Sequence, residues 1–182
     1  MPLLFPDTTV LVSFVLMARV DLFADLVGTN GAWTYTIAEE AARKSADPGM
    51  DGLQRFRGIL GEPLLPSPAE RIDTSRYRAR IATQGDHPRE HLGEAETIAI
   101  MVSRRVNGAF VTDDLAAADL ARSLDVGIRV YTTGDLIALA VRTKRTDLET
   151  AWNMIELLRL HQRARAMPTH RDHLSQWVFG NL

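Results

Sequence analysis

The stretch LLFPDTTVL at residues 3–11 passes from one structural pattern to another through a single acidic residue, Asp7. Residues 3–5 are apolar, and a short apolar run closed by a proline and an aspartate predicts a buried strand. A helix is expected from about Thr9, because apolar residues then recur at helical spacing until Gly28, a residue typical of a helix end. A strand that leads directly into a helix is the repeating unit of an α/β fold.

The same alternation continues along the chain. Further short strands are predicted at residues 32–36, 64–65, 109–112 and 128–131. Helices are predicted between and after them, one through Glu39, Glu40 and Lys44 and others at residues 52–60, 69–83, 94–107, 115–124 and 134–141. Strands separated by helices pair in parallel, so the pattern predicts an α/β domain with a parallel sheet, which we assign to residues 1–141.

Residues 142–182 differ in character from the part before them. A polar link at residues 142–145 is followed by Thr146 and Glu149, which have the spacing of a capping box at the start of a helix. The apolar face of that helix, and an apolar cluster at residues 177–179, must be buried against the domain, a second copy or another protein. We interpret residues 142–182 as a C-terminal helical extension of the α/β domain.

The composition limits the class of protein. The chain has 182 residues, of which 46% are hydrophobic and 24% charged, as in a single globular domain, and its net charge of −2 indicates no overall basic field for nucleic acid. It has no cysteine, which excludes a disulfide scaffold and a thiolate zinc site and favours the cytoplasm. Residues 3–20 are largely apolar, but Pro6 and Asp7 interrupt them, so no signal peptide or membrane span is expected.

Four segments of the chain carry acidic residues directly after a predicted strand or near the start of a predicted helix. They are Asp7, the pair Glu39 and Glu40, the pair Glu94 and Glu96, and the pair Asp113 and Asp114. The carboxyl ends of parallel strands and the adjoining helix N-termini face one crevice, so we expect these carboxylates to converge. Two unit charges about 4 Å apart repel by roughly 4 kcal/mol at an effective dielectric near 20. A cation would relieve that repulsion, and oxygen ligands without thiolates select magnesium or manganese.

Each charged group also has a structural interpretation. Glutamate favours the first turn of a helix, and an aspartate after a strand can be the N-cap of the next helix. Three arginines, Arg76, Arg78 and Arg80, either follow an RNA backbone or form a solvated helix face. The histidines, His87 and His91 among them, lack further partners at ligand-like spacing, and we expect them on the surface.

Four short motifs contain the acids in order. They are FPDTTVL at residues 5–11, IAEEA at residues 37–41, GEAE at residues 93–96 and VTDD at residues 111–114. Together they resemble the successive motifs of the PIN-domain nuclease family, many of whose members are VapC-like toxin ribonucleases. The resemblance covers about residues 3–141 and implies a three-layer α/β/α domain with a central parallel sheet of four to five strands.

By position, the resemblance implies a set of site residues. The implied catalytic and metal-binding acids are Asp7, Glu40, Glu94 and Asp114, with Asp113 as a further metal ligand and with Thr112 and Thr8 as substrate-orienting hydroxyls. Glu40 is preferred to Glu39 because it directly precedes a small apolar residue. Helical-wheel geometry does not separate Glu94 from Glu96, and the resemblance alone decides for Glu94.

The implied activity is that of a divalent-metal-dependent endoribonuclease, in which Mg²⁺ or Mn²⁺ activates a water molecule to hydrolyse RNA phosphodiester bonds. The toxins of the family imply an antitoxin protein and a homodimer as partners besides RNA. Two alternatives are a PIN fold with an idle site that acts as a binding module, and a haloacid-dehalogenase-type phosphatase with Asp7 as nucleophile. The phosphatase requires a second aspartate where Thr9 stands and a downstream lysine, and the chain has only Lys44 and Lys144.

Overall fold

The computed structural model describes residues 2–124 and 126–180. Within these residues the sheet has three parallel strands in the order β1 (Leu3–Pro6), β2 (Gly108–Val111) and β3 (Arg129–Tyr131). In the pairing of β1 with β2, Phe5 lies beside Phe110. The central strand, β2, is buried along its whole length, as expected for a parallel sheet covered on both faces. The predicted α/β class with a parallel sheet is confirmed.

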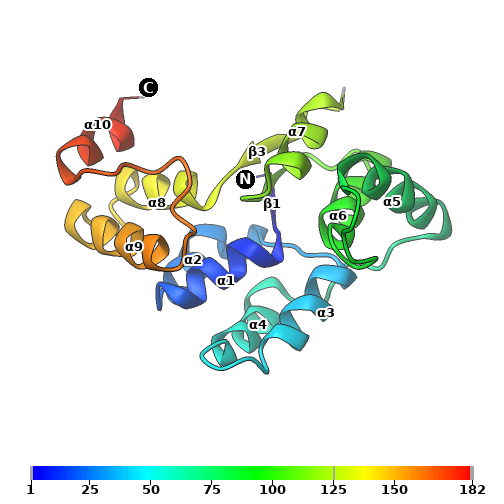
Figure 1. The fold of residues 1–182 in the computed structure, drawn as a ribbon, viewed down its shortest axis with the longest axis horizontal. Coiled ribbons are helices and arrows are strands. Elements are labelled where there is room, and N and C mark those ends of the chain that lie inside the picture. Colours follow the sequence, from blue (N-terminus) through cyan, green and yellow to red (C-terminus); the bar gives the residue numbers. More distant parts are fainter. Residues whose placement is uncertain (1, 125, 181–182) are drawn as a thin grey trace.

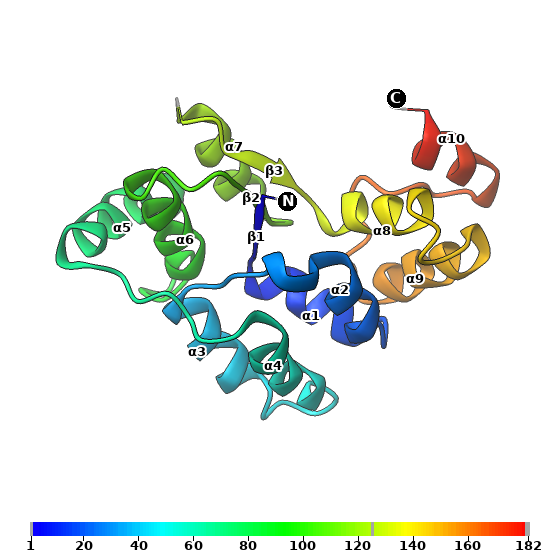
Figure 2. The same ribbon diagram turned by 180° about the vertical axis from the view of Figure 1, so that it is seen from behind.

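Helices cover both faces of the sheet (Figures 1 and 2). Side chains of a strand point alternately to opposite faces, so Leu4 packs into one hydrophobic cluster and its neighbour Phe5 into another. The Leu4 face is covered by α1 (Thr8–Leu16), α2 (Val20–Val27), α8 (Thr133–Arg142) and α9 (Leu148–Leu160). The Phe5 face is covered by α5 (Pro68–Ile81), α6 (Leu92–Ser103) and α7 (Leu115–Ser123).

A group of short helices closes one end of the molecule. Beneath α1 and α6 in Figure 1 lie α3 (Tyr35–Lys44) and α4 (Phe56–Leu60), the latter preceded by the 3-10 helix η2 (Asp51–Arg55). A further 3-10 helix, η1 (Gly28–Asn30), follows α2. Contacts of α3 with both α1 and α6 bring the start of α6 close to the end of β1.

The single helix predicted from about Thr9 to Gly28 is wrong, because the chain turns back between α1 and α2. Ala18 adopts a left-handed φ of 53°, and the Arg19 amide donates to the carbonyl of Phe14 at 2.9 Å. The turn lets Phe23 pack edge-to-face against Phe14, with ring centroids 5.1 Å apart. Burial of this aromatic pair explains why one periodic stretch forms two helices.

The described residues form a sheet of three strands, and the predicted four to five strands are not confirmed. Of the predicted strands at residues 32–36 and 64–65, only Thr34 and Leu64 pair, in an isolated parallel bridge, and Gly31 just before them forms another with Leu4. The first of these segments has no room to extend, since α3 begins at Tyr35. The two bridges continue the sheet beyond β1 without forming a ladder.

The C-terminal extension packs on its own domain. Its first helix, α9, is capped by Asp147, whose side chain accepts from the Thr150 amide at 2.7 Å, and not by the predicted Thr146. Its buried side chains belong to the same cluster as those of α1, α2 and α8. The last elements are η3 (Arg171–His173) and α10 (Leu174–Phe179), and α10 packs against α8. In the part of the chain that the structure describes, no helix combines the length and the apolar character needed to cross a membrane.

Candidate metal centre

Asp7 lies at the carboxyl end of β1, where it is the N-cap of α1. Its Oδ1 accepts from the amide of Val10 and from the hydroxyl of Thr9, both at 2.8 Å. Its Oδ2 accepts from the hydroxyl of Thr112, which follows the neighbouring strand β2. The side chain is fully buried, and burial raises the pKa of Asp7 to about 7 despite these hydrogen bonds.

Asp114 enters the same region from the end of β2. It is the N-cap of α7, and its Oδ1 accepts from the Ala117 amide at 2.9 Å. The Asp114 amide donates to the Thr112 hydroxyl at 3.0 Å, so one threonine ties the two aspartates together. The second carboxylate oxygen of Asp114 is turned toward the start of α6, where the His91 ring lies.

Glu94 and Glu40 come from α6 and α3. Burial raises the pKa of Glu94 to about 8, and the charges of Asp7, Glu40 and Asp114 raise it further. Burial also raises the pKa of Glu40, whose Oε2 accepts from the Thr8 hydroxyl at 2.6 Å. Asp7, Glu40 and Asp114 therefore all lie close enough to Glu94 for their charges to act on its carboxyl group.

Gly93 allows α6 and α3 to approach closely enough for this convergence. A Cβ atom at this position would lie 3.2 Å from Oε2 of Glu40 and only 2.4 Å from Cδ1 of Ile37. Because Ile37 is fully buried, its side chain has little space to move away. The glycine of the GEAE motif therefore has a packing function beside the acids.

The alternatives within each acidic pair are separated by their hydrogen bonds. Glu39 is exposed, and its side chain accepts from the hydroxyl of Tyr35 one turn earlier. Glu96 is buried and accepts from the amide and hydroxyl of Thr36 at 2.8 and 2.9 Å, which caps the first turn of α3. Glu94 is therefore the member of its pair that lies near Asp7, and Glu40 is the member of its pair that lies near Glu94.

Asp113 has a different environment from Asp114. Its two carboxylate oxygens accept from the amide and the hydroxyl of Thr133, at 2.8 and 2.6 Å, at the first residue of α8. It is near enough for its charge to raise the pKa of Asp7. The carboxylate is nevertheless engaged in joining β2 to α8, rather than in the group formed by the other acids.

His91 joins the acids, contrary to the expectation of a surface position. Its Nδ1 lies 3.3 Å from Oδ2 of Asp114, and its side chain is only 22% exposed. Ligand atoms of His91, Glu94 and Asp114 all lie within 4.8 Å of one another, close enough for one ion. No spacing in the sequence indicates this, because His91 acts from the N-cap position of α6 and with a left-handed φ of 61°.

The three arginines of α5 predicted to follow an RNA backbone have separate partners within the protein. Arg76 pairs with Asp73 at 3.0 Å, and Arg80 donates to Ser123 at 3.3 Å. Arg78 donates to the carbonyls of His87 and Glu90, both at 2.9 Å, and so holds the loop that carries His91.

Two other arginines, which sequence reasoning missed, border the acids. Arg43 and Arg89 line an open cleft of about 350 Å³ together with Glu40, Glu94 and His91. Arg43 follows Glu40 by three residues on α3, one helical turn away, and its charge partly offsets the raised pKa of that glutamate. The cleft therefore places guanidinium groups beside carboxylates, as a site for a phosphate and a cation requires.

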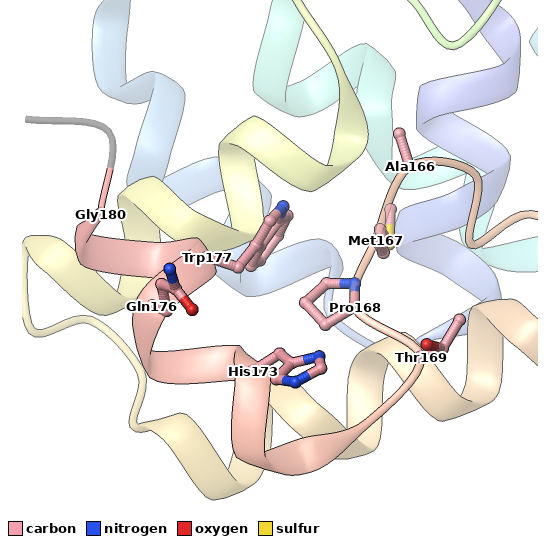
Figure 3. Close-up of a pocket in the computed structure, with 8 residues that line it drawn as sticks. All are labelled: Ala166, Met167, Pro168, Thr169, His173, Gln176, Trp177 and Gly180. Atoms are coloured by element: carbon pink, nitrogen blue, oxygen red, sulfur yellow. The ribbon is translucent and has the colours of Figure 1, made fainter.

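A larger pocket of about 480 Å³ lies in the C-terminal extension, between the segment after α9 and α10 (Figure 3). Trp177, Met167 and Pro168 line it, with His173 and Gln176 at the side (Figure 3). None of the motif acids lines this pocket. In Figures 1 and 2, α10 lies at the opposite end of the molecule from α3 and α6, so we assign the chemistry to the acidic cleft.

Comparison with known proteins gives no assignment of family. No protein-family model matches the chain, and a search of curated proteins finds no match. The site is therefore interpreted from its own geometry and chemistry.

Proposed function

We propose that this chain is a divalent-metal-dependent endoribonuclease with a PIN-like domain and a C-terminal helical extension. The observation that carries the proposal is that Asp7, Glu40 and Asp114, from three separate segments, all lie close enough to Glu94 for their charges to raise its pKa. The pKa of Asp7 is raised to about 7 and that of Glu94 to about 8, so the protein alone provides a poor environment for their charged forms. A bound cation would stabilise those charges.

The donors fit a hard divalent ion. Carboxylate oxygens are the ligands preferred by Mg²⁺ and Mn²⁺, and the described acids supply them without any thiolate. We assign the binding to the Asp7, Glu94 and Asp114 carboxylates, with Glu40 beside them. When bound, the ion would lower the pKa of a coordinated water and neutralise charge on the phosphate.

The threonines of the motifs act on the acids. The resemblance implies that Thr8 and Thr112 orient substrate, but Thr8 donates to Glu40 and Thr112 donates to Asp7. We propose that these hydroxyls hold the carboxylates in place. Arg43 and Arg89, on the rim of the same cleft, would bind the phosphates of the RNA backbone as guanidinium groups do.

RNA as the substrate rests on the resemblance to the PIN-domain family, as do an antitoxin protein and a homodimer as partners. The composition without cysteine supports a cytoplasmic setting. The phosphatase alternative is disfavoured by the sequence around and beyond Asp7. Thr9 stands where that chemistry requires a second aspartate, and the only lysines of the chain are Lys44 and Lys144.

A cleavage assay on labelled single-stranded RNA tests the proposal. The wild type should cleave this RNA with Mn²⁺ or Mg²⁺ and should not cleave it with excess EDTA. Single-stranded DNA of the same sequence serves as the comparison substrate. Asp7→Asn should lower the rate by about 100-fold or more, equivalent to roughly 3 kcal/mol of transition-state stabilisation. The matched control is Glu39→Gln, an acid of the same motifs that lies exposed on α3 and should leave the rate unchanged. Cleavage that persists in EDTA, or in a folded Asp7→Asn protein, would contradict the proposal.

A further inference from the structure

The His91 ring is held between two carboxylates. Its Nε2 lies 3.4 Å from Oδ2 of Asp86, and its Nδ1 lies 3.3 Å from Oδ2 of Asp114. Asp86 is not one of the converging acids. It is fixed in its own loop, where its carboxylate accepts from the amide and the hydroxyl of Thr83 at 2.7 and 2.9 Å. Asp86 thus contacts the ring from outside the group of converging acids.

This arrangement assigns different roles to the two ring nitrogens. Nε2 faces the Asp86 carboxylate, and Nδ1 faces Asp114 and the other ligand atoms of the group. With a metal bound, Nδ1 would give its lone pair to the ion while Nε2–H faces Asp86. A carboxylate behind one nitrogen and a metal at the other is the usual environment of a metal-binding histidine.

We propose that Nδ1 of His91 is a ligand of the divalent ion, together with the carboxylates of Glu94 and Asp114. The inference rests on the proposed function and deepens it by adding a nitrogen ligand to the acids. One ligand atom from each of the three residues lies within 4.8 Å of the others, a spread that a single ion can bridge. Asp86 is then a positioning residue, which acts on the ion through the ring.

The nitrogen ligand has a consequence for the choice of metal. Imidazole suits transition metals, whereas Mg²⁺ is bound almost wholly by oxygen. The site should therefore bind Mn²⁺ more tightly than Mg²⁺, and the preference should depend on His91. Removing a ligand or the group that orients it costs about 10- to 100-fold in metal affinity in comparable sites.

Electron paramagnetic resonance of bound Mn²⁺ tests the assignment without an activity measurement. Pulsed spectra of the wild type with one equivalent of Mn²⁺ should show ¹⁴N coupling from a directly bound imidazole. Protein labelled with ¹⁵N-histidine should show the ¹⁵N coupling in its place. In His91→Asn the coupling should disappear, and the affinity for Mn²⁺ should fall about 10-fold or more while that for Mg²⁺ changes less.

The matched control is His87→Asn, because His87 lines the same cleft but does not belong to the group of ligand atoms. It should keep both the coupling and the affinity, whereas Asp86→Asn should keep the coupling and lose part of the affinity. Bound Mn²⁺ without histidine coupling in the wild type would overturn the inference and leave the proposed function standing. A coupling that persists in His91→Asn would also overturn it. Failure of the wild type to bind Mn²⁺ at all would overturn both.

Discussion

The pKa values of the Asp7 and Glu94 carboxyl groups are both raised above their ordinary values. Burial is the largest cause for each, followed for Glu94 by the charge of Asp7 itself. Both carboxyl groups therefore hold protons in the folded, metal-free protein at pH values where they would be ionised in the unfolded chain. A pH dependence of stability follows from this difference.

The metal-free protein should lose stability as pH rises from 5 to 8.5. The pKa of Asp7 rises on folding from 3.8 to about 7 and that of Glu94 from 4.5 to about 8, so the folded state binds more protons between those values. Each group contributes its full stabilisation below its pKa in the unfolded chain and loses it as pH rises through its pKa in the folded protein. The loss is about 1.4 kcal/mol for each unit by which the two pKa values differ. The lowered pKa of Glu70, about 2, acts in the opposite sense only below pH 4.5, outside this window.

Denaturant unfolding in EDTA at several pH values measures the effect. Glu94→Gln should flatten the decline, because the amide cannot ionise, and added Mn²⁺ should restore stability to the wild type at pH 8.5. If the stability of the metal-free wild type increased between pH 5 and 8.5, or if Glu94→Gln kept the full slope, the account of the buried acids would be wrong.

At the scale of the elements, periodicity predicted the three strands of the sheet and most of the helices around them, but neither the break between α1 and α2 nor the loss of the strands predicted at residues 32–36 and 64–65. Contacts between elements distant in the sequence decided the features that periodicity could not predict. Glu94 and Glu96 occupy equivalent places near the start of α6, and they differ because the first turn of α3 requires an acceptor at Thr36. The break at Ala18 depends likewise on an aromatic pair across two helices, and the position of His91 depends on a loop held by Arg78.

Substitution of these two glutamates should therefore give opposite results. Glu96→Ala should lower the free energy of unfolding by about 1–2 kcal/mol, the usual cost of a lost helix cap, and should leave metal-dependent cleavage nearly unchanged. Glu94→Ala should abolish cleavage, and at pH 8 it should not destabilise the metal-free protein, because it removes a buried charge. Unfolding curves and initial cleavage rates of the two variants test this. Loss of cleavage in a folded Glu96→Ala protein would instead make Glu96 part of the site.

At the scale of the whole molecule, the C-terminal extension is continuous with the core of the domain. Met154, Ile155 and Leu158 of α9 are buried in the cluster that covers the Leu4 face of the sheet. The extension also reaches the neighbourhood of the site, since Arg163 donates to the carbonyl of Thr9 at 3.3 Å. The sequence predicted that the extension has an apolar face but not which surface covers it, because the domain itself, a second copy or another protein could each bury that face.

Truncation after Arg142 should leave the remaining domain unfolded or aggregated. Full burial of one large aliphatic side chain contributes about 1.5–3 kcal/mol, so loss of several exceeds much of a typical stability of about 5–15 kcal/mol. The milder variant Leu158→Ala should cost about 2–5 kcal/mol and leave the Mn²⁺ affinity of the folded protein unchanged. Leu160→Ala is the control, because that side chain is 79% exposed. A stable truncated protein, or equal stability of the two leucine variants, would contradict the packing of the extension on its own domain.

The central claim is that the converging acids hold a divalent ion, and anomalous diffraction from a crystal soaked in Mn²⁺ tests it most directly. The account predicts an anomalous peak enclosed by the carboxylates of Asp7, Glu94 and Asp114, with Nδ1 of His91 at bonding distance. It also predicts that the peak disappears from crystals of Asp7→Asn grown under the same conditions. An acidic cleft without a peak, with Mn²⁺ found only elsewhere on the molecule, would contradict it.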